Sequence, residues 1–333
     1  MKALVADRYG DNSVVRVADV PKPALRDHDV LLEMHAASVN PIDFKIRAGK
    51  LKTIRRFEFP LILGCDGSGV VSEVGPAATR FKEGDEVFVR FDKERMGAFA
   101  EFAVVDESLC APKPKTIDHH AAAAVPLVGL TSWQALVDLG RLEAGQRVFI
   151  PAGSGGVGTI AIQIAKHRGA TVATTTSAKN TDLVRSLGAD VIVDYTKDDF
   201  ARVIEGQDLV FETMGGEAEL RSLAVLKRGG AMVGIAGLPD AAFAREAGMN
   251  AVVRLALRVM TAKRTRLARR LGVRYTYLFM RPDGAELALL GDLVDRGVLK
   301  PIVDRVFPLA QAADALAYLE TGRARGKVVL AMK

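Results

Sequence analysis

The chain has 333 residues, of which 49% are apolar and 26% are charged, a balance typical of globular proteins with a buried core. A chain of this length can form two domains. The two cysteines, Cys65 and Cys110, exclude a disulfide framework and favour a reducing compartment, so we expect a cytoplasmic protein. The start, "MKALVADRYG", lacks the apolar segment of a secretory signal, and no uncharged apolar run reaches the ~18 residues of a membrane span.

The net charge of +6 is concentrated in one stretch of the chain. Residues 254–274 contain eight Lys or Arg residues and no acid, and removing these eight charges from +6 leaves −2 for the rest. Apolar and basic positions alternate there at helical spacing, which favours a solvated, partly packed helix. Contact with anionic lipid or with nucleic acid through 254–274 is an alternative that we do not favour.

Along the chain, the pattern of apolar residues changes near residue 125. Before it, short apolar runs separated by Gly, Pro and Asp predict β-strands, at 28–39, 69–75, 85–91 and 100–105. After Gln146, predicted strands alternate with helices: strands at 146–152, 170–176, 190–195 and 208–213, helices at 155–169 and 180–189. A strand at 274–280, a helix at 284–297, a strand at 300–309 and a final helix and strand within 312–333 complete the prediction. This alternation predicts a doubly wound parallel sheet, an α/β fold.

A glycine-rich motif lies where the first predicted strand of this sheet passes into a helix. The segment "AGSGGVG" (152–158) fits G-x-G-x-x-G through Gly153, Gly155 and Gly158. In this context the first glycine permits a tight turn, the second lets a pyrophosphate approach, and the third lets the helix pack close to the strand. Free N–H groups at the start of the helix would hold the phosphates. The motif predicts dinucleotide binding.

The end of the second predicted strand indicates which dinucleotide binds. A site for NAD usually has Asp or Glu there to hold the ribose 2′-hydroxyl. Here the segment is "TTTSAKN", with no acid from Thr171 until Asp182. Ser177 can donate a hydrogen bond to a 2′-phosphate, and Lys179 can pair with it. We therefore expect NADP(H), although Lys179 taken alone would be an ordinary surface lysine.

Several further motifs resemble one superfamily. The order of a β-rich first part, "GLTSWQAL" (129–136), "AGSGGVG" and "ARGKVVL" (324–330) resembles the medium-chain dehydrogenase/reductase superfamily over nearly the whole chain. The segments "SVNPIDFKIRAG" and "LVRSLGADVIVDYTK" resemble its zinc-independent quinone oxidoreductases, above all the alkenal/enone oxidoreductase branch. The resemblance implies a Rossmann NADP-binding domain (126–281) and a GroES-like catalytic domain (1–125, rejoined by 282–333). It also implies a homodimer, with an active cleft between the two domains.

Zinc-bearing relatives bind their catalytic metal with Cys, His and Cys. By this resemblance the three positions fall on Asn40, Cys65 and the neighbourhood of Leu127. One soft ligand out of three, with Asp43 and Asp66 beside it, does not make a catalytic zinc site. We therefore expect no metal, and Cys65 is either a small core residue or a reactive thiol in a cleft.

The resemblance also implies roles for individual residues. Asn40 would contact the substrate oxygen or the nicotinamide, unless it only caps a loop. Lys327 would reach back to the cofactor phosphates, unless it is a solvated lysine at a strand edge. The other implied cofactor-binding residues are Thr131, Gly153, Gly155, Gly156, Val157, Gly158, Ser177, Lys179 and Tyr195.

The predicted function is NADPH-dependent reduction of a small electrophile without a metal. Without a Lewis acid, the acceptor must be intrinsically electrophilic, which fits quinones and the C=C bond of α,β-unsaturated carbonyls. The alternatives are an enoyl-thioester reductase and a non-enzymatic protein that binds NADPH or RNA. No proton donor is evident: Tyr275 and Tyr277 are candidates, which we expect to point to opposite faces of one strand.

Overall fold

The computed structural model describes residues 1–52, 55–246 and 248–333, and the chain divides into two units. The first comprises Met1–Leu130 and Arg281–Lys333, and the second comprises Thr131–Met280. The expected boundaries, after residues 125 and 281, lie within a few residues of these divisions. Each unit is described by itself.

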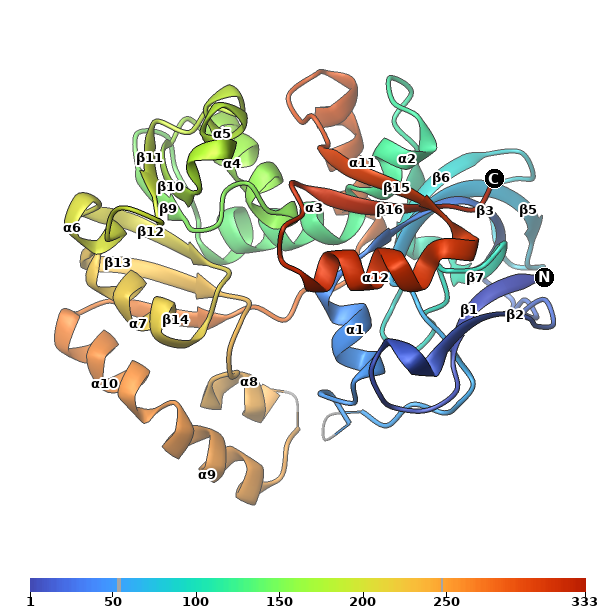
Figure 1. Ribbon diagram of the computed structural model, residues 1–333, viewed down its shortest axis with the longest axis horizontal. Helices are drawn as coiled ribbons and strands as arrows, with labels where there is room; N and C mark the ends of the chain where they lie inside the picture. The colour runs from blue at the N-terminus through green and yellow to red at the C-terminus, as the bar shows by residue number, and fades with distance from the viewer. Residues whose placement is uncertain (53–54, 247) are drawn as a thin grey trace. The chain divides into compact units, whose positions relative to one another are not determined.

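The first unit is built on a seven-stranded sheet (Figure 1). Six strands follow the order β15-β16-β3-β5-β6-β8, and β7 also pairs with β3. The strands are β3 (Asp29–Val39), β5 (Asp66–Val74), β6 (Glu86–Arg90), β7 (Phe102–Asp106), β8 (Cys110–Pro112), β15 (Val303–Pro308) and β16 (Lys327–Ala331). A smaller sheet contains β1 (Lys2–Ala6), β2 (Val15–Asp19) and β4 (Leu61–Ile62). The helices are α1 (Pro41–Arg47), α2 (His119–Ala123), α11 (Gly284–Asp295) and α12 (Ala312–Glu320).

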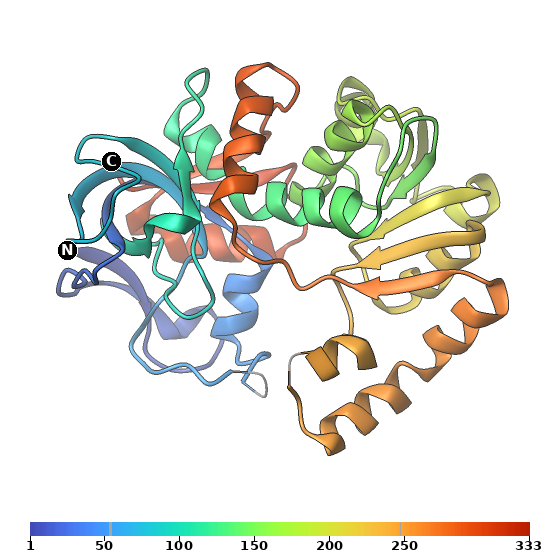
Figure 2. The ribbon, with the colours of Figure 1, turned by 180° about the vertical axis from the view of Figure 1, so that it is seen from behind.

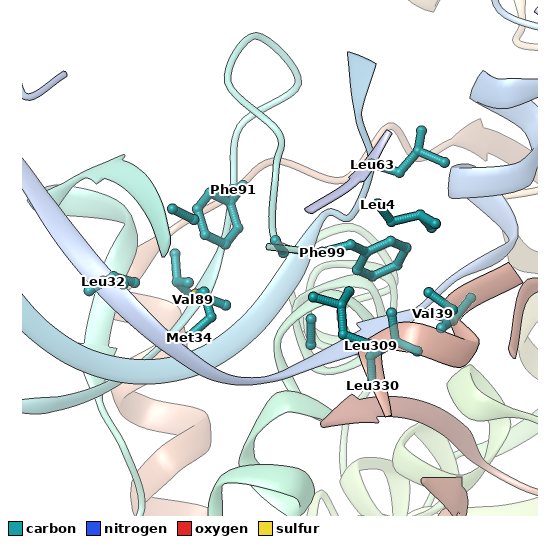
Figure 3. Close-up of a cluster of buried hydrophobic side chains, with 14 of the residues drawn as sticks. Leu4, Leu32, Met34, Val39, Leu63, Val89, Phe91, Phe99, Leu309 and Leu330 are labelled. Atoms are coloured by element: carbon teal, nitrogen blue, oxygen red, sulfur yellow. The ribbon is translucent and has the colours of Figure 1, made fainter. Parts of the chain in front are cut away.

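The core of this unit joins residues from both of its chain segments. Figure 3 shows Leu4, Val39 and Phe99 close to Leu309 and Leu330, all of them buried. Strand β16 is an inner strand, parallel to β15 and antiparallel to β3, with Val328 opposite Val39. Strands β15 and β16, from the second chain segment, therefore belong to the same sheet as β3, from the first segment.

The second unit is a six-stranded parallel sheet in the order β11-β10-β9-β12-β13-β14. Its strands are β9 (Arg147–Ile150), β10 (Thr171–Thr176), β11 (Val191–Asp194), β12 (Gln207–Glu212), β13 (Leu226–Gly234) and β14 (Arg274–Tyr277). The helices are α4 (Gly156–His167), α5 (Thr181–Ser186), α6 (Phe200–Val203), α7 (Gly216–Ala224), α8 (Ala241–Glu246), α9 (Ala251–Met260) and α10 (Ala262–Leu271). The helix α3 (Pro126–Trp133) spans the division between the units and continues as a π-helical segment, η3 (Gln134–Leu139). The predicted fold class, α/β with a doubly wound parallel sheet and a β-rich unit, is confirmed.

Strand order places the glycine motif at the centre of this sheet. The chain runs outward from β9 through β10 to β11, then returns to β12 and continues to β14. Since crossovers between parallel strands are right-handed, the helices of the two halves lie on opposite faces. The reversal falls between β9 and β12, the place where such sheets bind ligands beyond the carboxyl ends of the strands.

The basic segment 254–274 forms two helices and a strand rather than one helix. Helix α9 ends at Thr261, whose hydroxyl donates to the carbonyl of Leu257 (2.7 Å), and α10 follows directly. Figure 2 shows both helices in orange beyond β14. The prediction of partial packing holds for α10, which contacts α7 and β14, whereas Leu257 is the one residue of α9 that is buried. Within the described ranges, no helix is long and apolar enough to cross a membrane.

The expectation for Tyr275 and Tyr277 is wrong, because residues two apart on a strand share a face. Burial raises the pKa of both phenols, and both lie within the electrostatic range of Arg264 and Glu219. The guanidinium of Arg264 donates to the Tyr275 hydroxyl (2.9 Å) and to the Glu219 carboxylate (2.9 Å). The Tyr275 hydroxyl thus has a structural partner inside the second unit.

Candidate functional site

The loop between β9 and α4 forms a cradle of backbone N–H groups. Gly155 is the residue before the helix, and its carbonyl accepts the first helical hydrogen bond, from Thr159 (2.9 Å). Among the described residues, no acceptor pairs with the N–H groups of Gly156, Val157 or Gly158. Unpaired N–H groups at the start of a twelve-residue helix favour a bound anion.

The glycines of the motif are needed for close backbone packing. A Cβ atom on Gly158 would lie 2.5 Å from the Ala152 oxygen, and one on Gly153 would lie 2.2 Å from Thr174 Oγ1. A Cβ on Gly155 would meet only the Ala152 oxygen, at 3.3 Å, and otherwise point into open space. Gly158 thus has the packing role expected for it, and Gly155 leaves room above the loop as expected. Gly153, expected to permit a tight turn, is needed for close packing against Thr174.

At the carboxyl ends of β10 and β11, the structure brings together Ser177, Lys179 and Tyr195. The Tyr195 N–H donates to the Thr176 oxygen (3.1 Å), which places Tyr195 beside the residue that precedes Ser177. Lys179 and Tyr195 are exposed, and Ser177 is partly exposed. Asp194 of β11 lies opposite Thr176, and its carboxylate accepts hydrogen bonds from the N–H (3.0 Å) and the hydroxyl (2.7 Å) of Thr196. This edge can thus contact a phosphate through Ser177 and Lys179.

Sequence reasoning missed two polar residues next to this edge. The Asn180 amide donates to the Ser154 hydroxyl (3.2 Å), which also accepts from the Thr176 hydroxyl (3.0 Å). Asn180 Oδ1 is buried and lacks a hydrogen-bond partner among the described residues. A buried acceptor without a donor fits a hydroxyl of a bound nucleotide. The glycine motif could have indicated Ser154, which lies within it, whereas nothing in the local sequence distinguishes Asn180.

The loop after β12, "ETMGG", is fixed by a buried carboxylate. Glu212 accepts hydrogen bonds from the N–H of Gly215 (2.7 Å) and of Met214 (3.1 Å). Burial raises the pKa of Glu212. Thr131, the remaining predicted contact of this unit, lies on α3 and is 5% exposed. The N–H cradle, the orphaned Asn180 oxygen and the absence of an acid from the end of β10 itself together fit NADP(H).

The first unit contains a buried polar network centred on Asp66. One carboxylate oxygen accepts from the Ser38 hydroxyl (2.6 Å) and the Asn40 amide (2.7 Å), and the other accepts from the Leu127 N–H (2.9 Å). The ammonium of Lys327 donates to Asn40 Oδ1 and to the Val39 carbonyl (3.3 Å). Both ends of the Asn40 amide are therefore held, and Asn40 is 1% exposed. Its predicted contact with substrate or nicotinamide stays a prediction.

Two alternatives from the sequence are now settled. Lys327 is not a solvated edge lysine, because β16 is an inner strand and the residue is 4% exposed. The side chain of Asn40 does not cap helix α1; instead, the Asp43 carboxylate accepts the Asn40 N–H (2.7 Å). Whether Lys327 contacts the cofactor phosphates stays a prediction.

Cys65 pairs with Asp43 inside the same unit. Its thiol is buried and lies 3.1 Å from Asp43 Oδ1. Burial, together with the neighbouring Asp43 carboxylate, raises the pKa of the Cys65 thiol, so the thiolate form is disfavoured. Cys65 is thus a buried, hydrogen-bonded core residue, and the alternative of a reactive cleft thiol is wrong. In the described parts of the chain, no three His, Cys, Asp or Glu residues are placed to hold a metal ion.

The Asp43 carboxyl gives the unit a pH-dependent stability. Burial raises the pKa of Asp43 from 3.8 to about 7, and Asp66 adds to the shift while Cys65 and Lys327 oppose it. A raised pKa means that the folded state binds the proton more tightly than the unfolded state. The contribution of Asp43 to stability therefore falls as the pH rises from about 4 to about 7, by ~4 kcal/mol at most.

We expect Asp43→Asn to remove this dependence of the free energy of unfolding on pH. Relative to the natural chain, the variant should gain stability with each step from pH 5 to about 7 and then level off. Urea unfolding at several pH values measures the difference. Asp182→Asn, at a fully exposed side chain, is the matched control and should show no such trend. If the free energies of unfolding of Asp43→Asn and of the natural chain differed by the same amount from pH 5 to about 7, the Asp43 carboxyl would not titrate in this range.

Comparison with known proteins identifies the family of the chain. Residues 26–115 match the family model of the alcohol dehydrogenase GroES-like domain, and residues 187–330 match that of a zinc-binding dehydrogenase. The chain is 36% identical to the mitochondrial NAD(P)H oxidoreductase RTN4IP1 of Danio rerio, over 100% of this chain and 91% of that protein. It is 35% identical to the chloroplastic NADPH-dependent alkenal/one oxidoreductase of Arabidopsis thaliana, over 99% of this chain and 79% of that one. The solved quinone oxidoreductase of Coxiella burnetii matches with a TM-score of 0.87 and 32% identity, covering 100% of this chain and 99% of that one.

A Rossmann sheet with a phosphate cradle, joined to a GroES-like unit, defines a nucleotide-dependent oxidoreductase. The chain belongs to the medium-chain dehydrogenase/reductase superfamily, in its branch of quinone and alkenal/enone oxidoreductases.

Proposed function

We propose that the protein is an NADPH-dependent reductase that acts on quinones or on the C=C bond of α,β-unsaturated carbonyls, without a metal ion. The observation that carries this proposal is the carboxyl edge of β10, where Ser177 and Lys179 lie beside the phosphate cradle with no acid on that strand end. A 2′-phosphate gains charge-assisted hydrogen bonds there, whereas an acid would repel it. NADPH, when bound, supplies the hydride.

The buried network of the first unit supports chemistry without zinc. Of the three positions at which relatives bind the metal, two fall on Asn40, whose amide donates to Asp66, and on Cys65, whose thiol pairs with Asp43. These two side chains are thus committed to hydrogen bonds within the protein, and near the third position the backbone N–H of Leu127 donates to Asp66. Without a Lewis acid, the protein must position an acceptor that delocalises the added charge itself, as a quinone or an enone does.

The proposal is tested by following the loss of NADPH absorbance with a small quinone, a short alkyl enone and an enoyl thioester in parallel. We expect turnover with the quinone or the enone, unchanged by a metal chelator. Turnover with the enoyl thioester alone would instead identify an enoyl-thioester reductase. No turnover with any acceptor, in a protein that still binds NADPH, would favour a binding protein.

Cofactor preference gives a sharper test of the β10 edge. Lys179→Ala should lower kcat/KM for NADPH about 10-fold and leave that for NADH unchanged, because one charge-assisted bond is worth roughly 1.5–3 kcal/mol. Ser177→Asp should reverse the preference. Lys82→Ala, at an exposed lysine of the first unit, is the matched control. Equal losses with both cofactors would contradict the assignment of this edge to the 2′-phosphate.

The assembly and location of the protein stay predictions. A homodimer is supported by β14, which pairs with β13 and forms one edge of the parallel sheet. An open strand edge can pair with a second copy. Light scattering would measure the molecular mass in solution, and the mass of a monomer at the concentration used for the activity assay would contradict the homodimer. A cytoplasmic location rests on the cysteine content alone.

A further inference from the structure

We propose that helix α9, with the adjoining cations of α10, is an interfacial surface that docks the protein on a bilayer containing anionic lipid. The surface comprises the exposed apolar residues Val252, Leu255 and Val259 and the flanking arginines Arg254 and Arg258. The inference concerns where the protein is held and does not depend on the identity of the acceptor.

The first observation is an exposed apolar face. Val252, Leu255 and Val259 follow the spacing i, i+3, i+7, which places them on one side of α9. Their exposed fractions are 78%, 62% and 68%, and Met260 at the end of the helix is 63% exposed. Only Leu257 of this helix is buried, on a different side. Most apolar residues of the helix therefore lie in solvent.

The second observation is uncompensated positive charge beside this face. Arg254 and Arg258, four residues apart, flank it, and Lys263, Arg266, Arg269 and Arg270 of α10 are also exposed. Within the described ranges, none of these side chains has a carboxylate partner, whereas the buried Arg264 is paired with Glu219. A helix with an apolar face and Lys or Arg around it binds at the boundary between headgroups and acyl chains.

A depression on this surface combines both properties. Arg245, Arg254 and Arg258 line it together with Ala251 and Leu255, and its volume is about 290 Å³. Three arginines and two apolar residues in one lining suit a phosphate that is joined to a hydrocarbon chain. A lipid headgroup in the plane of a bilayer has this chemistry.

The same features disfavour the other two kinds of partner. Neither α9 nor α10 contains an aromatic side chain on which a base could stack, so single-stranded nucleic acid would be held by its phosphates alone. A symmetric contact with a second copy would bring the cationic patch against itself. On an anionic bilayer, the apolar face can contact the acyl chains while the Lys and Arg side chains contact the negatively charged headgroups.

The test is sedimentation of the full chain with lipid vesicles. We expect binding to vesicles with about one-third phosphatidylglycerol, little binding to pure phosphatidylcholine, and at least a ~10-fold loss of binding between about 0.1 M and 0.5 M salt. Leu255→Asp with Val259→Asp should weaken binding ~10-fold or more. Arg254→Gln with Arg258→Gln should weaken it at low salt and flatten the salt dependence.

Matched controls distinguish an effect of this surface from a general effect of changing an exposed apolar or charged residue. Leu289→Asp changes an exposed residue of α11 in the first unit, and Arg296→Gln changes the exposed residue that follows this helix; both variants should bind vesicles like the natural chain. Every variant should keep its NADPH turnover with a water-soluble acceptor, which shows that it is folded.

Three results would overturn the proposal. Equal binding to neutral and anionic vesicles, or none to either, would exclude an anionic bilayer. Retention of a labelled single-stranded RNA that is lost in the double arginine variant, without vesicle binding, would assign the surface to nucleic acid. Dissociation of an oligomer by Leu255→Asp with Val259→Asp would assign it to a second copy of the chain.

Discussion

Replacing Gly158 with alanine is expected to weaken NADPH binding by about 100-fold, equivalent to ~3 kcal/mol. The new Cβ would lie 2.5 Å from the Ala152 oxygen and 2.7 Å from Gly153 Cα, both of them backbone atoms that cannot rotate away. The loop must then move away from the helix. Its N–H groups would lose the alignment that two charge-assisted bonds to a phosphate require. Fluorescence titration with NADPH measures the effect.

Two further alanine substitutions make this result specific. Gly155→Ala adds a methyl group above the same loop, with one tight contact at 3.3 Å to the Ala152 oxygen and open space elsewhere, so it should weaken NADPH binding while lowering the stability of the cofactor-free protein much less than Gly158→Ala does. Gly158→Ala should lower both. Gly291→Ala, inside α11 of the first unit, meets only ordinary contacts at 3.5 Å and beyond, so it should leave NADPH affinity unchanged and should not lower stability. Unchanged NADPH affinity in Gly158→Ala would refute the assignment of the cradle.

Replacing Lys327 with methionine is expected to destabilise the first unit by ~3–5 kcal/mol. The ammonium is buried beside Asn40, and the carboxyls of Asp43 and Asp66 lie within its electrostatic range. Its loss leaves Asn40 Oδ1 without a donor and the carboxylates without a buried cation. Urea unfolding of the variant measures the loss, and Lys45→Met, at an exposed lysine of α1, should change stability by less than ~0.5 kcal/mol.

A second substitution identifies the partner. Asp66→Asn in the Lys327→Met background should cost less than it does alone, since the two charges compensate each other. The predicted contact of Lys327 with the cofactor phosphates gives a different outcome. In that case Lys327→Met would raise the KM for NADPH while the free energy of unfolding stayed nearly constant.

Local patterns in the sequence were sufficient to place the glycine loop between a strand and a helix. Gly153, Gly155 and Gly158 lie within six residues, and the strand before them and the helix after them have clear apolar periods. The absence of an acid on β10 can likewise be read directly from the segment around Ser177. Such features depend on short-range geometry, which the order of residues specifies almost completely.

The Asp66 network could not be read from the sequence, because its members are far apart in the chain. Asn40 is 26 residues from Asp66 and 287 residues from Lys327. Lys327 resembles a surface lysine until its strand is known to lie between β15 and β3. The break at Thr261 was hidden for a different reason: the helical period continues on both sides of it, and only the backbone shows the interruption.

The inner position of β16 has a consequence for the order in which the chain folds during synthesis. Residues Val328–Ala331 pair with β3, so the sheet of the first unit lacks this strand until synthesis has passed residue 331. All residues of the second unit leave the ribosome before β16 does. Because domains tend to fold as units when their residues are available, the Rossmann unit should fold first, although its sequence begins later. Until β16 arrives, the nascent first unit holds Asn40 and Asp66 without the lysine that accompanies them in the finished protein.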